Sequence, residues 1–171
     1  MSVTAELSQF TAALTLERLP PALVERARYL VLDLAGNIVR ARALESSAPL
    51  LAAVASLGWT PGRCHVFGDP GSYTPTGAAL VNGCLAHSLD FDDTHAEGSL
   101  HPGAAVIPAA LAAAEMKGRS GATALEGIVA GYEIACRLAL ALPGAASAQR
   151  STRSPPVPGS VLWRSDAGTP W

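Results

Sequence analysis

The chain has 171 residues, the size of one globular domain, and 49% of them are hydrophobic whereas only 5% are aromatic. This composition, in which Ala and Leu dominate, favours closely packed helices over sheets, so we predict an all-α, bundle-like domain. The formal net charge is -2 and the basic residues form no cluster, which argues against nucleic acid or a membrane surface as a partner.

Apolar periodicity predicts the first three helices. A short helix is expected over residues 4–14, with Thr4 as its cap. A longer helix should begin at Pro20-Pro21, because proline suits a first helical turn, and its apolar residues recur at steps of three and four as far as Ile38. A third helix over residues 48–57 should end at Gly58, which can adopt the left-handed conformation of a C-terminal cap.

The pattern changes in the middle of the chain. Residues 59–73 are rich in Pro, Gly and β-prone residues, which predicts an irregular segment with one small hairpin. A fourth helix should then start at Thr74-Pro75 and continue through Leu89 into a polar cluster over residues 90–95.

Two further helices are predicted after this cluster. The first covers residues 103–117, so that His101 lies at its N-terminus. The second runs from Thr123 to about residue 142 and should begin with a capping box formed by Thr123 and Glu126. Gly127 and Gly131 share one face of it, where we expect close approach of a neighbouring helix.

Beyond residue 144 the sequence becomes rich in Ser, Pro, Arg and Gly and loses its periodicity. We therefore predict an incomplete helical domain over residues 1–144 and a tail over residues 145–171 without regular structure, either disordered or the product of a frameshift. The three cysteines are far apart, no apolar run reaches membrane-spanning length, and no targeting segment is recognisable, so we expect a cytoplasmic protein.

Acidic and imidazole groups concentrate between His87 and His101. On a continuous helix His87, Asp90 and Thr94 would share one face. His101 would lie at the positive end of a helix dipole, which favours a neutral imidazole and a bound carboxylate nearby. Together these groups could abstract a proton next to a carboxylate and donate one to a leaving hydroxyl group.

Other interpretations of the same residues stay open. The polar groups could cap and cross-link a helix–loop junction without any catalytic role. Residues 90–94 also have the DxDxT form of aspartyl phosphatases and the DxDD form of terpene cyclases, but they lack the preceding hydrophobic strand of the former, and the chain lacks the aromatic residues that the latter need. A divalent metal could use Asp90, Asp93, His95 and His101, but their spacing fits no standard signature, and we predict no metal.

The block NGCLAHSLDFDDTH over residues 82–95, followed by HPGAAVIP over residues 101–108 and GYE over residues 131–133, resembles the MmgE/PrpD family. The resemblance covers roughly residues 4–143. It implies a helical domain that is joined in whole members to a smaller lid domain, usually in homodimers. It also implies action on a small polycarboxylate by dehydration, decarboxylation or epimerisation, without a metal or organic cofactor.

By motif, the resemblance identifies Asp90, Thr94 and His101 as catalytic residues, with His101 as the proton carrier. It offers three weaker candidates for substrate binding: His87, Asp93 and His95. The block differs from that of the 2-methylcitrate dehydratases and looks closer to an epimerase-like or uncharacterised branch.

Family members are much longer than this chain, and no arginine lies between His87 and His101 to hold a carboxylate. We therefore expect a truncated chain that is weakly active or inactive as an enzyme. The alternative is a non-catalytic helical remnant or interaction module.

Overall fold

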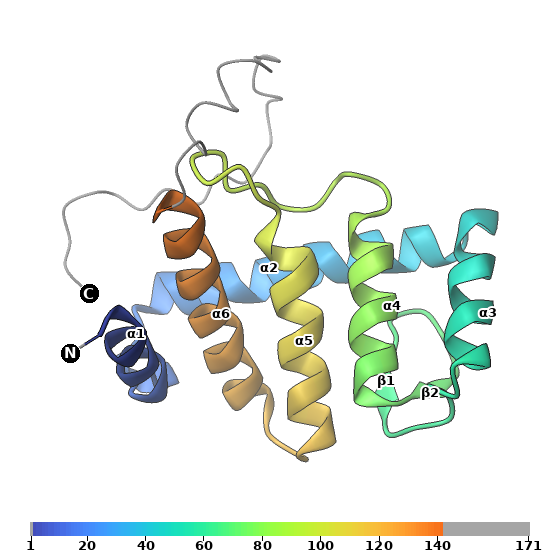
Figure 1. The fold of residues 1–171 in the computed structure, drawn as a ribbon, viewed down its shortest axis with the longest axis horizontal. Coiled ribbons are helices and arrows are strands. Elements are labelled where there is room, and N and C mark those ends of the chain that lie inside the picture. Colours follow the sequence, from blue (N-terminus) through green and yellow to red (C-terminus); the bar gives the residue numbers. More distant parts are fainter. Residues whose placement is uncertain (1, 142–171) are drawn as a thin grey trace.

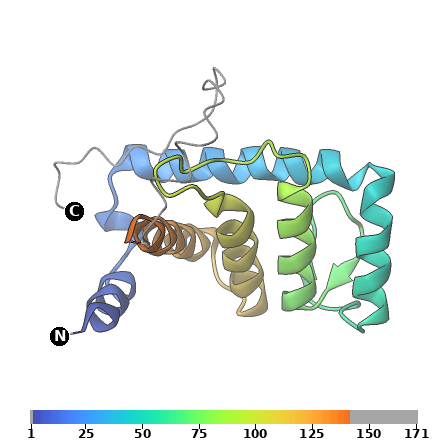
Figure 2. The same cartoon turned by 45° about the horizontal axis from the view of Figure 1, so that its top comes forward.

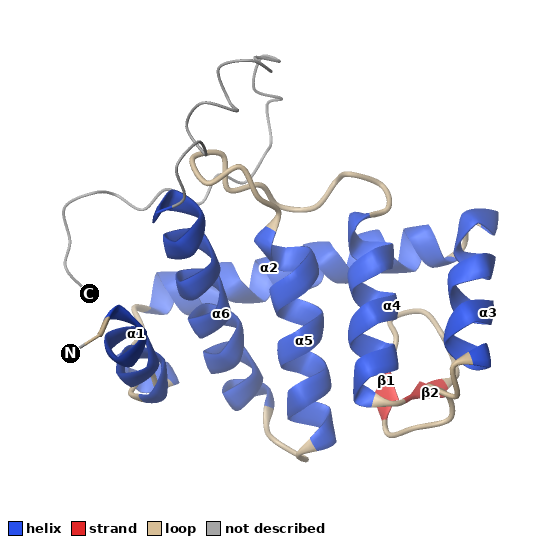
Figure 3. Cartoon of the chain, in the orientation of Figure 1, coloured by secondary structure: helices blue, strands red, loops and turns tan. Residues whose placement is uncertain are grey.

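Helices make up most of the protein in its computed structural model, which describes residues 2–141. The predicted tail over residues 145–171 lies outside the described residues. Two short 3₁₀ turns, Leu16–Arg18 and Glu45–Ser47, accompany the helices. One pair of short strands is also present (Figure 3). The helices are α1 (Val3–Ala12), α2 (Pro21–Arg42), α3 (Ala48–Ser56), α4 (Pro75–His87), α5 (Pro102–Met116) and α6 (Gly121–Ala141), and the strands are β1 (Cys64–His65) and β2 (Ser72–Tyr73). The prediction of an all-α fold is confirmed.

Three helices lie side by side in one layer, and a fourth crosses them. α4 packs against α5 and α5 against α6, with neighbours running in alternating directions, while α2 contacts all three (Figures 1 and 2). The loop over residues 88–101 joins α4 to α5 at one end of this layer (Figure 1). The polar cluster of the sequence therefore lies at the edge of a helical layer.

The core forms where α2 meets the layer. Pro21 is the first residue of α2, as predicted, and the apolar stripe of this helix is buried. Its buried residues are Ala27, Leu30, Leu34, Ile38 and Ala41. All of them except Ala27 join one continuous cluster with Val81, Ile107 and Ile128 from the three helices of the layer. Burying a side chain of this size stabilises the fold by about 1.5–3 kcal/mol, so the crossing of α2 positions the layer.

Two glycines allow the helices of the layer to approach closely. A Cβ atom added at Gly83 of α4 would lie 2.8 Å from the backbone oxygen of Ala104 in α5. A Cβ atom at Gly131 of α6 would lie 2.5 Å from Cγ1 of Val106. At Gly127 the nearest atom would be 3.6 Å away, which is an ordinary contact. The predicted close approach is confirmed for Gly131 and is not required at Gly127.

The N-terminal caps predicted from the sequence for α1 and α6 are wrong. Ser2, and not Thr4, caps α1, because its hydroxyl accepts a hydrogen bond from the Ala5 amide at 3.3 Å. At the start of α6 the hydroxyl of Ser120 accepts from the Thr123 amide, also at 3.3 Å. Each helix begins earlier than expected, so an earlier serine takes the capping position.

The predicted hairpin is present as the antiparallel pair of β1 and β2. The side chain of Asn82 in α4 fastens it to the layer: Oδ1 accepts from the Phe67 amide at 3.1 Å, and Nδ2 donates to the His65 carbonyl at 3.0 Å. Asn82 of the NG pair thus has a structural role, because it binds the hairpin to α4. No helix within the described residues has the length and apolar character needed to cross a membrane.

Candidate active site

The polar cluster lies in a loop and not on a helix. α4 ends at His87, two residues before the predicted end, and the amide of Asp90 donates to the His87 carbonyl at 3.0 Å. Asp90 has a φ of 55°, in the left-handed region that aspartate tolerates better than most residues. The prediction that His87, Asp90 and Thr94 share one helical face is therefore wrong.

The loop nevertheless turns back and brings the predicted catalytic residues together. The amide of His95 donates to the Leu100 carbonyl at 2.8 Å, which closes the segment between them into a turn. Thr94 Oγ1 then lies 3.5 Å from His101 Nδ1. Polar side-chain atoms of Asp90 and His101 approach within 4.8 Å of each other. His101 is the last residue before α5, as predicted.

Asp92, which was not among the predicted site residues, lies within this cluster. Its side chain is fully buried, with Oδ2 3.0 Å from His87 Nδ1 and Oδ1 3.6 Å from His101 Nδ1. The negative charge of Asp92 also acts on Asp33 of α2. Burial is the main cause that raises the pKa of the Asp33 carboxyl, and repulsion by Asp92 raises this pKa further. Only the path of the loop shows that Asp92 faces inward.

Asp93 points to other partners than its neighbour. Its Oδ1 accepts from the Gly103 amide in the first turn of α5 at 3.0 Å, and its Oδ2 accepts from the hydroxyl of Tyr132 in α6 at 3.0 Å. Burial raises the pKa of Asp93 although both hydrogen bonds favour the carboxylate. The carboxylate at the N-terminal, positive end of α5 is therefore that of Asp93 and not that of a bound acid. A contact of Asp93 with substrate stays a prediction.

His95 forms its hydrogen bonds within the loop itself. Its side chain is buried, and its Nδ1 accepts from the Gly98 amide at 2.9 Å. A neutral ring that accepts at Nδ1 carries its proton on Nε2. His95 therefore stabilises the turn over residues 95–100, and its proposed contact with substrate likewise stays a prediction.

His87 and His101 line an open hollow of about 550 Å³ beside the cluster. Their rings meet edge to face, with centroids 5.1 Å apart. The rest of the lining is small or apolar and comes from α4 and α5: Ala79, Leu80, Gly83, Cys84, Ala104 and Ala105. Among the described residues that line the hollow, only the two imidazoles can carry a positive charge. We therefore expect an acid in the hollow to contact them.

The same cluster has the ligand types of a divalent-metal site. His87, Asp90, Asp92 and His101 each offer one atom, and these atoms all lie within 4.8 Å of one another. Only Asp90 and His101 were in the metal set considered from the sequence. The prediction that the protein uses no metal stays a prediction.

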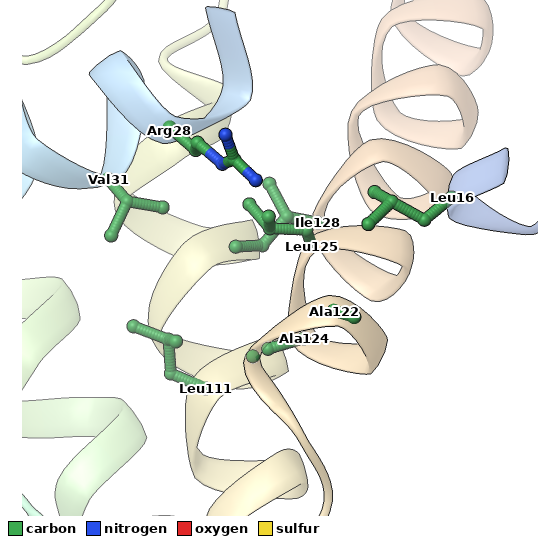
Figure 4. A pocket seen from close by; sticks show the side chains of 9 residues that line it. Leu16, Arg28, Val31, Leu111, Ala122, Ala124, Leu125 and Ile128 are labelled. Carbon is green, nitrogen blue, oxygen red and sulfur yellow. The ribbon is translucent and has the colours of Figure 1, made fainter. Parts of the chain in front are cut away.

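A second hollow lies away from this chemistry. It has a volume of about 420 Å³ between α2, α5 and α6, and its lining is apolar except for Arg28 (Figure 4). Val31, Leu111 and Ile128 are among the side chains around it. None of the predicted site residues lines it, so the hollow at His87 and His101 is the candidate active site.

Comparison with known proteins finds similar sequences for most of the chain. The model of the MmgE/PrpD N-terminal domain matches residues 5–154. A cis-aconitate decarboxylase-like protein of Aspergillus oryzae is 33% identical over 168 residues, which are 93% of this chain and 34% of that protein. The cis-aconitate decarboxylase of Aspergillus terreus is 33% identical over 149 residues, or 83% of this chain and 30% of the enzyme. The human cis-aconitate decarboxylase is 48% identical over 56 residues, or 32% of this chain and 11% of the enzyme. The chain spans about a third of the length of the first two relatives.

Proposed function

The chain belongs to the MmgE/PrpD family, and we propose that it carries the part of the enzyme in which His101 transfers a proton beside a carboxylate of a small polycarboxylate substrate. Asp90 and Thr94 orient the substrate in this proposal. A carboxylate can accept from a substrate hydroxyl, and a threonine hydroxyl can donate to a substrate carboxylate.

The observation that carries the proposal is the position of His101 itself. Its ring lines the open hollow while Thr94 Oγ1 lies 3.5 Å from its Nδ1. A carboxylate oxygen of Asp90 lies within 4.8 Å of a ring nitrogen of His101 in the same cluster. An imidazole held between polar partners at the wall of a hollow can exchange a proton with a bound acid.

Among the family's reactions we favour decarboxylation of a cis-aconitate-like acid, because the relatives named above are cis-aconitate decarboxylases or resemble them. When a carboxyl group leaves as CO2, the electron pair of the broken C–C bond stays on the carbon framework and must take up a proton. Protonated His101 is the donor in this proposal. Dehydration and epimerisation would need the same proton carrier.

A second candidate is a helical module that binds such acids but turns them over slowly or not at all. Among the described residues, no lysine or arginine lines the hollow. The hollow therefore lacks, within these residues, the cationic side chains that commonly bind the carboxylates of such a substrate. A family-like homodimer and a cytoplasmic location stay predictions, and light scattering of the purified chain tests the first.

Solvent deuterium exchange separates the two candidates. The 171-residue chain is incubated in D2O with cis-aconitate and related acids, and stereospecific incorporation of deuterium is followed by NMR. We expect exchange that falls about 10²- to 10⁴-fold in His101→Ala. His65→Ala is the matched control, because His65 lies in the hairpin and pairs with Glu115 at 3.1 Å. Absence of exchange into every acid, or exchange that His101→Ala leaves intact, would refute the catalytic proposal.

A further inference from the structure

Asp92 faces two imidazoles at once from a buried position. Its side chain has no exposed surface, whereas the side chains of His87 and His101 are 55% and 32% exposed. His87 Nδ1 lies 3.1 Å from Oδ1 and 3.0 Å from Oδ2 of this carboxylate. His101 Nδ1 lies 3.6 Å from Oδ1. The two rings therefore turn the same nitrogen toward one shared carboxylate.

This arrangement decides where each ring keeps its proton. An ionised carboxylate has no hydrogen to donate, so the nitrogen that faces it is the one that carries hydrogen. A neutral imidazole carries a single N–H, and its other nitrogen then holds the free electron pair. Because Nδ1 faces Asp92 in both rings, at 3.0 Å in His87 and 3.6 Å in His101, the arrangement favours hydrogen on Nδ1 and a free electron pair on Nε2.

Thr94, the other close partner of His101, does not select one tautomer of the ring. Thr94 Oγ1 lies 3.5 Å from the same Nδ1, but a hydroxyl group either donates or accepts and so suits both tautomers. Asp90 is exposed, whereas Asp92 is buried. A buried carboxylate interacts more strongly with its partners than an exposed one, because water screens it less.

We propose that Asp92 is a positioning residue that holds both His87 and His101 with hydrogen on Nδ1 and leaves Nε2 of each ring available to a ligand in the hollow. This inference rests on the proposed function, because it states which nitrogen of His101 transfers the proton. It adds His87 as a second imidazole held in the same state at the wall of the same hollow.

NMR of the chain labelled with ¹⁵N-histidine tests this proposal without any substrate. Long-range ¹H–¹⁵N correlations at about pH 8, where ordinary imidazoles are neutral, show which ring nitrogen carries hydrogen. The chain has four histidines, so single substitutions assign the signals. We expect the Nδ1–H form to dominate in His87 and His101, and the ratio of the two forms to fall about tenfold or more in Asp92→Asn, because the asparagine amide can also donate.

Glu115→Gln is the matched control, because Glu115 holds His65 Nδ1 at 3.1 Å outside the site. It should change the signals of His65 alone. A dominant Nε2–H form in the unsubstituted His101, or unchanged tautomers in a folded Asp92→Asn variant, overturns the proposal. If that variant does not fold, the unsubstituted protein still decides the question. Deuterium exchange that is insensitive to His101→Ala would instead refute the proposed function, so the two failures are distinguishable.

Discussion

The adjacent residues Asp92 and Asp93 have different roles in the loop because their carboxylates contact different partners. Asp92 faces the imidazoles of His87 and His101, whereas Asp93 joins the first turn of α5 to Tyr132 of α6. Burial of a carboxylate is unfavourable unless hydrogen bonds compensate for the lost water. Substitutions around Asp93 should therefore change stability, whereas substitution of Asp92 should change the state of the histidines.

We expect Tyr132→Phe to destabilise the fold in a way that depends on pH. The hydroxyl of Tyr132 donates to Asp93 at 3.0 Å, and losing a hydrogen bond to a charged group costs about 1.5–3 kcal/mol. Burial already raises the pKa of Asp93 above its unfolded value of about 3.9, and loss of this bond would raise the pKa further. The folded state then binds the extra proton, so stability is retained below the unfolded pKa and is lost as the pH rises through the folded pKa.

Urea unfolding between about pH 3.5 and pH 8 measures this effect. The deficit of Tyr132→Phe relative to the unsubstituted protein should be smallest at the acid end and should grow as the pH rises. Tyr29→Phe is the control, because the exposed Tyr29 hydroxyl donates to Glu25 at the surface of α2 at 3.2 Å. A deficit that is constant over the whole range, or as large in Tyr29→Phe, would contradict the assigned role of Asp93.

Sequence motifs could predict Asp90, Thr94 and His101 but not Asp92. The three predicted residues come together in the structure, although the reason given for two of them, a shared helical face, is wrong. Which aspartate of the DFDD run faces inward depends on the left-handed residue at Asp90 and on the turn that follows it. Neither feature leaves a periodic signal in the sequence.

At the scale of helices, two glycines of the layer should respond in opposite directions to alanine. A Cβ atom at Gly83 would press on the backbone of α5, at 2.8 Å from the oxygen of Ala104, and a backbone cannot move aside as a side chain can. We expect Gly83→Ala to lower stability by about 1–3 kcal/mol. Gly127→Ala meets only an ordinary contact at 3.6 Å, so the gain in helix propensity should raise stability by up to about 1 kcal/mol. Thermal unfolding of the two variants measures both signs, and equal shifts would argue against close packing of α4 on α5.

Periodicity predicted every α-helix of the described residues but not the residues that cap α1 and α6. Several serines and threonines near each start can serve as caps, and the local sequence does not rank them. The expected capping box of α6 fails for a reason that is not local. The carboxylate of Glu126 accepts instead from the amide of Leu16 at 2.9 Å, a residue 110 positions away in the sequence. Only the folded arrangement of the N-terminal segment against α6 reveals this contact.

At the scale of the whole molecule, the core and the candidate site place the three cysteines in different environments. Cys64 and Cys136 are buried in the core, whereas Cys84 is exposed in the lining of the hollow beside His87 and His101. Burial raises the pKa of the Cys64 thiol and raises that of Cys136 to about 11. Because the thiolate is the reactive form, the two buried cysteines should be inert toward thiol reagents. The reactivity of the Cys84 thiol can therefore report whether a ligand occupies the hollow.

We expect one equivalent of a thiol reagent to modify the folded chain, at Cys84, and a bound polycarboxylate to slow this reaction. A ligand present at about ten times its Kd occupies most of the sites and should slow labelling about tenfold if it covers the thiol. The rate is measured with and without cis-aconitate, against sodium chloride of equal ionic strength, since salt alone screens surface charges. Cys84→Ser should remove the labelling, and His101→Ala should remove the protection, because the imidazole is one of two groups in the lining that can carry a positive charge toward a carboxylate. Equal protection by the salt and by cis-aconitate would show that acids do not bind in the hollow as proposed. Labelling of Cys64 or Cys136 would contradict the inertness expected from their burial.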